Sequence, residues 1–182
     1  MQEPEVADGI GPTLQFNPAR REAEVHPVTV SLTSMARMLR YITQKVPSQP
    51  YTASACAVWC FDARFGRLAR LFEDYQTALV DFVAVAGGAK GLIEEGPARE
   101  YILRQIEASL QLHRPGQIVL MVHEDCGAYG RHFDDQETTR NFYASELQQA
   151  AIVVREFLKV EGVQGVSIKK LYADFEGLWE VE

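Results

Sequence analysis

Hydrophobic and polar positions follow two alternating periods along most of the chain. Short apolar runs of strand length alternate with longer stretches in which apolar residues recur every three or four positions, as on one face of a helix. The runs that predict strands are residues 55–61, 81–88, 117–123, 166–174 and, after a turn, a last short strand within 175–182. The stretches that predict helices are residues 67–79, 98–113 and 141–162. Because continuously apolar strands need cover on both faces, this order predicts an α/β fold with a mostly parallel central β-sheet flanked by helices.

The N-terminal part of the chain does not follow this alternation. Proline, glycine and mixed charges in residues 1–29 predict an irregular N-terminal arm. Apolar residues at helical spacing in 34–46 predict an amphipathic helix, which the prolines at 47 and 50 end. No linker or internal repeat follows, so we expect residues 30–182 to form a single domain.

Composition narrows the classes of partner and compartment. The net charge is −7 and the basic residues are scattered, which argues against nucleic acid or an anionic membrane as the partner. No apolar run reaches the roughly 18 residues of a membrane span, and the acidic N-terminus does not resemble a secretory signal. The three cysteines are too few for a disulfide scaffold. We therefore expect a cytoplasmic protein whose thiols are buried, as for Cys56 in its small apolar context, or functional.

Unusual residues follow three of the predicted strands. The first strand ends in Cys60-Phe61-Asp62-Ala63-Arg64, the second in a glycine-rich stretch at 86–91, and the third in His123-Glu124-Asp125-Cys126-Gly127. Ligands of open parallel sheets bind outside the carboxyl ends of the strands. If these strands are neighbours, the three ends meet in one crevice, and the glycines allow close approach to it.

Two of these strand ends carry residue types that bind zinc. Cys60, His123 and Cys126 would supply two sulfurs and one nitrogen, and a catalytic zinc site leaves a fourth position open. Asp62 would then lie beside the metal, and Arg64 would keep it ionised and aimed. Zinc lowers the pKa of a bound water to about 7, which creates hydroxide at neutral pH. Either motif alone is a weak signal, whereas their coincidence on two strands of one sheet is more specific.

Other interpretations of the same loops have less support from the residue spacing. A thiol phosphatase needs five residues between its cysteine and its arginine, but only four separate Cys126 from Arg131, and two acids precede the cysteine. The glycine-rich stretch lacks the spacing of a phosphate-binding loop, so Lys90 is expected to be solvated. His132 is either an exposed side chain or a proton shuttle, since imidazole titrates near neutral pH.

Taken together, Cys60-x-Asp62-x-Arg64 and His123-x-x-Cys126-Gly127-Ala128 resemble the motifs of the β-class carbonic anhydrases. The stretch 81–88 is similar to the second strand of that family, and 166–181 to its closing strands, so the resemblance covers roughly residues 30–182.

The resemblance implies a site and a reaction. Cys60, His123 and Cys126 would be zinc ligands, and Asp62 and Arg64 the catalytic dyad. The reaction would be CO2 + H2O ⇌ HCO3⁻ + H⁺, carried out by zinc-bound hydroxide. It also implies a homodimer or a multiple of dimers, in which the N-terminal segment embraces the partner.

One departure from the family leaves alternatives open. Ala84 and Val85 stand where the family usually has Arg-Asn before the Ala-Gly turn, which puts bicarbonate handling in doubt. A catalytically silent zinc-binding homologue, acting as a scaffold or an anion-binding subunit, is one alternative. A hydrolase of COS or CS2 on the same ligands is another. The sequence also leaves open whether water or Asp62 is the fourth zinc ligand.

Overall fold

The computed structural model describes residues 45–46 and 48–182 of the chain. The predicted N-terminal arm (1–29) and all but the last two residues of the predicted helix at 34–46 lie outside the described residues. Residues 48–182 belong to one compact unit.

Within the described residues, five strands form one sheet in the order β2-β1-β3-β4-β5. They are β1 (Ala55–Cys60), β2 (Val80–Val85), β3 (Gln117–His123), β4 (Ser167–Ala173) and β5 (Leu178–Glu180). The first four are parallel, and only β5 pairs antiparallel, with β4. The predicted α/β fold with a mostly parallel sheet is therefore confirmed.

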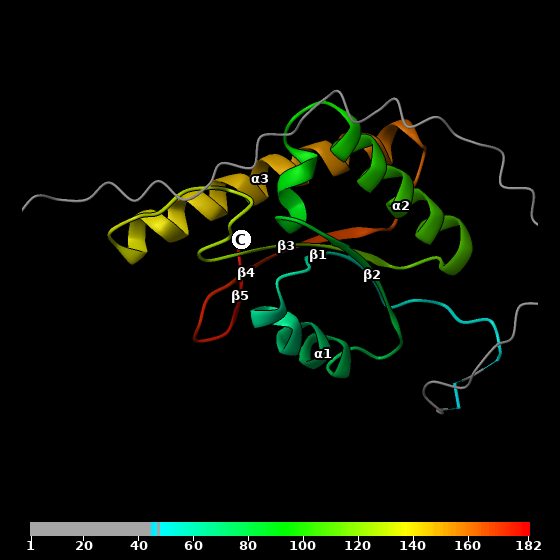
Figure 1. Cartoon of the computed structure of the whole chain (residues 1–182). Helices are drawn as coiled ribbons and strands as arrows, with labels where there is room; N and C mark the ends of the chain where they lie inside the picture. The colour runs from blue at the N-terminus through cyan, green and yellow to red at the C-terminus, as the bar shows by residue number, and fades with distance from the viewer. Residues whose placement is uncertain (1–44, 47) are drawn as a thin grey trace, which may run out of the picture. The chain divides into compact units, whose positions relative to one another are not determined.

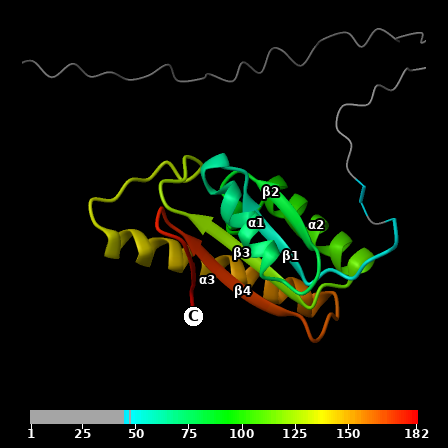
Figure 2. The same ribbon diagram turned by 90° about the horizontal axis from the view of Figure 1, so that it is seen from below.

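Helices cover both faces of this sheet. They are α1 (Gly66–Asp74), α2 (Pro97–His113) and α3 (Gln136–Val160), with two short 3-10 helices, η2 (Ala63–Phe65) and η3 (Gly88–Leu92). Figure 1 shows α2 and α3 on one face and α1 on the other, and Figure 2 shows α1 in front of the strands from below. None of the described helices is long and apolar enough to cross a membrane.

The core is centred on the two middle strands. Every residue of β1 is buried, and so is every residue of β3 after Gln117. Strands covered on both faces need this continuous apolar sequence. In the edge strand β2 only Val80 and Val83 are buried, and the other four residues are partly or fully exposed. Cys56 is fully buried on β1, where burial raises the pKa of its thiol to about 11, as expected for an inert packed cysteine.

Two helix boundaries differ from the prediction by five residues, and the others by two at most. Helix α3 begins five residues earlier than expected, because the side chain of Asp135 accepts a hydrogen bond from the backbone N–H of Thr138 and caps it. Helix α1 ends five residues earlier, at Asp74. A turn and bends follow, and Ser54 ties this segment to the start of β1: its hydroxyl donates to the carbonyl of Ala78 at 2.9 Å and its backbone N–H to the carbonyl of Leu79 at 2.9 Å.

A hydrogen-bonded cluster ties β2 to the C-terminal end of α2, near the start of the strand. The carboxylate of Asp81 accepts from the hydroxyls of Ser109, at 2.6 Å, and Tyr51, at 2.7 Å, and lies 2.8 Å from Nδ1 of His113. Burial alone would raise the pKa of Asp81, but these three partners lower it overall. The hydrogen bond to Asp81 in turn raises the pKa of Tyr51 to about 12. The cluster is thus built around an ionised carboxylate.

Candidate metal centre

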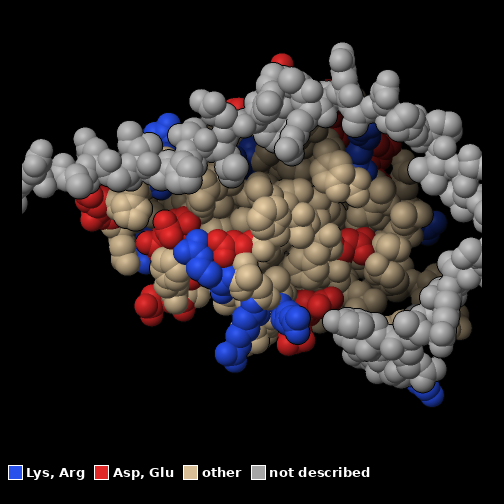
Figure 3. Space-filling view, in the orientation of Figure 1, with Lys and Arg blue, Asp and Glu red and all other residues tan. Residues whose placement is uncertain are grey.

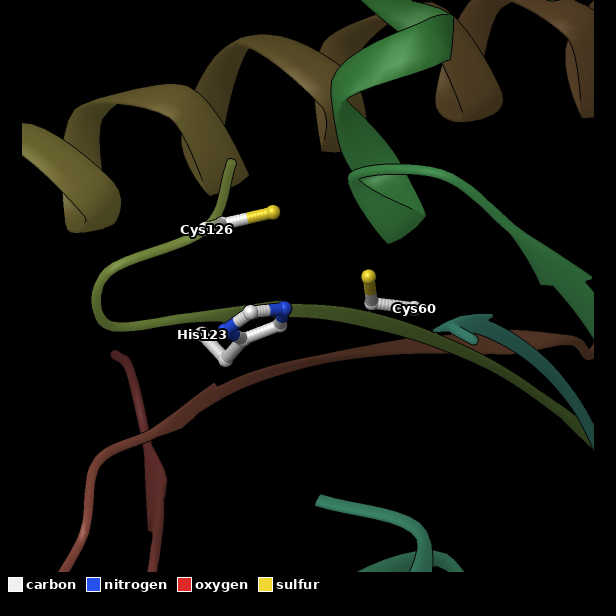
Figure 4. A group of neighbouring side chains, drawn as sticks. All are labelled: Cys60, His123 and Cys126. Atoms are coloured by element: carbon white, nitrogen blue, oxygen red, sulfur yellow. The ribbon is translucent and has the colours of Figure 1, made fainter. Parts of the chain in front are cut away.

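Three possible metal ligands meet at the carboxyl edge of the sheet. Cys60 is the last residue of β1 and His123 the last of the neighbouring β3, and Cys126 lies in the loop that follows. Figure 4 shows the two sulfurs and the imidazole converging from these segments. Their ligand atoms lie within 4.8 Å of one another, and all three residues are buried. Sequence-distant side chains of the types that bind zinc are therefore brought together in one buried cluster.

The imidazole of His123 is fixed with one nitrogen left over. Its Nδ1 lies 2.7 Å from the carbonyl oxygen of Glu124, and because a carbonyl only accepts, Nδ1 donates, so that in the neutral ring that can bind a metal Nε2 carries the lone pair. The ring of Phe65 stacks on the imidazole, with 4.3 Å between centroids. Nε2 is buried and has no hydrogen-bond partner within the described part of the chain. Buried polar atoms are rarely left without a partner, so this atom fits a metal ligand.

The two thiols differ in the direction in which their pKa is shifted. The pKa of Cys60 is lowered mainly by the hydrogen bond from Cys126, although burial alone would raise it. Hydrogen bonds from His123 and from the backbone N–H groups of Asp62 and Gly87 lower it further. The pKa of Cys126 is raised, mainly by the Cys60 thiolate it donates to. The pKa of His123, which burial alone would lower, is raised by the same thiolate and the Glu124 carbonyl. The pocket therefore attracts positive charge, and zinc, which binds thiolates and neutral imidazole, matches this donor set.

Two glycines after β2 let η3 pack against the site. Gly87 and Gly88 have φ angles of +77° and +56°, which side-chain-bearing residues rarely adopt. A Cβ on Gly88 would lie 2.2 Å from the backbone oxygen of Met121 and 3.1 Å from the backbone nitrogen of Cys60. This is the close approach predicted from the glycine-rich stretch, and it brings the N–H of Gly87 to the Cys60 sulfur.

Asp62 and Arg64 form a two-point ion pair beside the three ligands. Nε of Arg64 lies 3.1 Å from both carboxylate oxygens of Asp62, and Nη2 lies 2.7 Å from Oδ2. The hydrogen bonds from Arg64 are the main reason that the pKa of Asp62 falls to about 2. Oδ2 of Asp62 is 3.9 Å from the unpaired Nε2 of His123. An ionised acceptor thus lies at the edge of the pocket at neutral pH.

The phosphatase alternative finds no support in this geometry. The Arg131 guanidinium carbon lies 5.5 Å from the centroid of the Phe142 ring, so the cation packs on an aromatic ring of α3. The Cys126 thiol is buried and its pKa is raised, whereas a nucleophilic cysteine needs a lowered pKa.

Two other side chains in this region were considered from sequence. Lys90 is not solvated as expected: its ammonium donates to the carbonyl of Ala128 and lies 5.2 Å from the centroid of the Tyr129 ring, because η3 folds back over this loop. The side chain of His132 is 86% exposed, with Nδ1 3.8 Å from Oδ1 of Asp125, and its role as a shuttle stays a prediction.

Sequence reasoning missed the part that Asp125 plays. Its side chain and its carbonyl both contact Arg64, yet in the sequence it was only an acid that disfavours phosphate. The Glu124 carbonyl and the Gly87 N–H were also missed, because backbone groups leave no residue-type signal. For Asp125 the available signal was its position inside the H-x-x-C motif, where a tight loop suits residues that tolerate a left-handed backbone.

Comparison with known proteins gives a family and a fold. The model of the family described as "Putative carbonic anhydrase" matches residues 51–181. No curated protein matches the sequence. The β-carbonic anhydrase isoform I of Trichomonas vaginalis is 16% identical, with a TM-score of 0.50 over 77% of this chain and 87% of that one.

Two further solved structures are similar at lower scores. A carbonic anhydrase from Streptococcus mutans is 18% identical, with a TM-score of 0.46 over 77% of this chain and 87% of that one. The apo form of a carbon disulfide hydrolase is 16% identical, with a TM-score of 0.41 over 73% and 80%. At 16% identity, the likeness to the Trichomonas vaginalis enzyme bears on the fold alone.

Proposed function

Because the chain belongs to the β-class carbonic anhydrase family, we propose that it catalyses the reversible hydration of CO2 to bicarbonate with zinc held by Cys60, His123 and Cys126. The observation that carries the proposal is the convergence of three ligand atoms within 4.8 Å, next to an ionised carboxylate; one of the three is a buried nitrogen without a partner among residues 45–46 and 48–182.

The proposed chemistry divides the work between the metal and the chain. Zinc bound there would act as a Lewis acid and lower the pKa of a water ligand to about 7. Asp62, ionised at neutral pH, can only accept a hydrogen bond, so it would orient the attacking water. With a pKa of about 2 it cannot hold a proton at neutral pH, so the released proton has to pass to another group or to solvent. Arg64 keeps the Asp62 carboxylate charged and fixes its direction.

The test is stopped-flow CO2 hydration on zinc-loaded protein. We expect a rate well above buffer for the wild type and a fall on the order of 100-fold for Asp62→Asn, because the amide presents a donor in place of one acceptor oxygen. Asp134→Asn removes an exposed acid from the loop between β3 and α3 and should keep the wild-type rate. A zinc-loaded wild type with no rate above buffer would contradict the activity.

A catalytically silent homologue is the second candidate, and the sequence departure at Ala84 favours it. Ala84 is exposed on the edge strand β2, and it has no charge to offer an anion. A silent scaffold or anion-binding subunit predicts full zinc content together with identical, background rates for wild type and Asp62→Asn. The COS or CS2 alternative predicts hydrolysis of those substrates, with CO2 as a weak competitor.

Assembly and compartment belong to the proposal as well. We expect a homodimer or a multiple of dimers in the cytoplasm. Charged side chains of both signs are interspersed on the face seen in Figure 3 and leave a broad uncharged area, which suits contact with another subunit. The edge strand β2 adds Phe82, whose side chain is partly exposed.

A further inference from the structure

Arg64 is held by two acids rather than one. Beyond its pair with Asp62, its Nη1 lies 2.9 Å from Oδ2 of Asp125, and its Nη2 lies 3.0 Å from the backbone oxygen of Asp125. A guanidinium has five N–H groups, and these contacts leave only one, on Nη1, without a partner. The side chain is thus anchored from the His123–Cys126 loop as well as from its own turn.

The backbone conformation at Asp125 limits which residue types suit this position. Its φ is +51°, and Arg114 is the only other non-glycine residue with a positive φ in the part of the chain that is described. Such a conformation costs most residues roughly 1–2 kcal/mol. Figure 4 shows the tight loop that it makes possible between His123 and Cys126. Glycine or asparagine would turn the chain equally well. Only an acid adds the charge that pairs with Arg64.

The contact between Arg64 and Asp125 matters because Asp62, the other partner of Arg64, lies close to the candidate metal ligands. Its Oδ2 lies 3.9 Å from Nε2 of His123, so a small movement would bring this carboxylate onto a metal held by the three ligands. While Arg64 is fixed to the ligand loop, it retains Asp62 in the ion pair. If the Asp125 charge is lost, Arg64 keeps its contacts with Asp62, with the backbone oxygen of Asp125 and with the rings of Phe65 and Phe175, but it loses its ion pair with that loop.

We infer that Asp125 is a positioning residue that anchors Arg64 and thereby keeps the Asp62 carboxylate out of the metal's ligand set. The inference rests on the proposed function only in taking the metal to sit on Cys60, His123 and Cys126. The inference says which group is the fourth ligand of the metal. Because Asp125 holds Arg64, and Arg64 holds Asp62, that ligand is an exchangeable one and not Asp62.

The test measures whether that fourth position accepts an added anion. The protein and its variants are loaded with Co²⁺, and azide binding is followed by the change in the cobalt absorption spectrum at one fixed pH. Asp125→Asn removes the charge and keeps a residue that tolerates the left-handed backbone. Asp125→Gly also removes the charge, and glycine adopts this backbone conformation without strain. Asp134→Asn is the matched control for the loss of one negative charge. The double variant Asp62→Ala/Asp125→Asn removes the carboxylate that would fill the position.

We expect azide to bind the wild type and Asp134→Asn alike, at least about tenfold more weakly to both Asp125 variants, and at the wild-type level again to the double variant. A wild type that takes up cobalt but does not bind azide, Asp125 variants that bind like the wild type, or a double variant that stays weak would each overturn the inference. A wild type that takes up no metal would overturn the proposed site as well. Normal azide behaviour without CO2 hydration would contradict the proposed activity alone.

In the metal-free protein, NMR of the arginine side chains gives a second measurement. The Nη1 hydrogens of an anchored Arg64 should exchange slowly with water, and we expect them to exchange faster in Asp125→Asn, because Nη1 loses its charged partner while Nε and Nη2 stay paired with Asp62. Unchanged exchange of the Nη1 hydrogens in that variant would count against the anchor.

Discussion

The free Nε2 of His123 is the residue-scale feature on which the metal site depends. The Glu124 carbonyl holds the ring from one side and Phe65 stacks on its face, so the lone pair faces the two sulfurs in a buried pocket. An unfilled buried acceptor lowers stability, and a bound metal would remove that penalty.

Zinc should therefore stabilise the folded protein through this residue. A ligand at 100 times its Kd adds about 2.7 kcal/mol, which corresponds to a rise in Tm of roughly 5–10 °C for a chain of this size. We expect this rise on adding zinc to metal-free wild type and its loss in His123→Asn. His132→Asn, a change of an exposed imidazole, is the control and should keep the rise. An equal rise in His123→Asn would show that zinc binds elsewhere.

Asp81 predicts a pH dependence that is separate from the metal site. Its lowered pKa means that its ionised form stabilises the fold above the unfolded value of about 4, and that this contribution is lost as the pH falls through the folded pKa. Asp81→Asn should lower the free energy of unfolding at pH 7 by about 1–2 kcal/mol. Below pH 3 the difference from wild type should shrink. Urea unfolding at both pH values checks this, and a constant difference would contradict the assignment.

At the scale of elements, the turn between β2 and η3 decides whether the site can form. Gly88 is pressed against the backbone of β1 and β3, and its φ is left-handed. Gly88→Ala should cost at least about 2 kcal/mol of stability, since no flexible side chain can give way. Gly66→Ala is the matched control: a Cβ there meets nothing within 4 Å, so it should be neutral or stabilising. Equal stability of the two variants in urea unfolding would refute the close approach.

Elements were predictable where apolar periodicity is strong and less so at their ends. The bounds of β3 agree with the prediction, because a continuous apolar run stops at its first polar loop residue. The start of α3 was missed because its first turn is polar and its signal is the cap at Asp135. The residue types of the candidate site were visible in the sequence. The second anchor on Arg64 was not, because it depends on a loop conformation that brings Asp125 back across the strand ends.

At the scale of the whole molecule, the parallel sheet brings distant motifs to one edge. Cys60 and His123 are 63 positions apart in sequence and lie at the ends of adjacent strands. The topology therefore explains how two weak motifs can form one pocket, and the family and fold comparisons agree with it.

The proposed assembly makes a simple prediction at this scale. Sedimentation equilibrium of the full chain should give a mass of twice the 20.4 kDa of one chain, or an even multiple of it. A stable monomer at micromolar concentration would contradict the dimer without touching the metal site, because all three candidate ligands come from one chain.

The central claim is that Cys60, His123 and Cys126 together hold zinc, and metal analysis of the purified full-length protein tests it most directly. We predict about one zinc per chain in the wild type, a large loss of zinc in Cys60→Ser, and an unchanged content in Cys56→Ser, whose thiol is packed in the core away from the site. Wild-type protein that holds no zinc after exposure to the metal, or Cys60→Ser that holds as much as the wild type, would contradict the account.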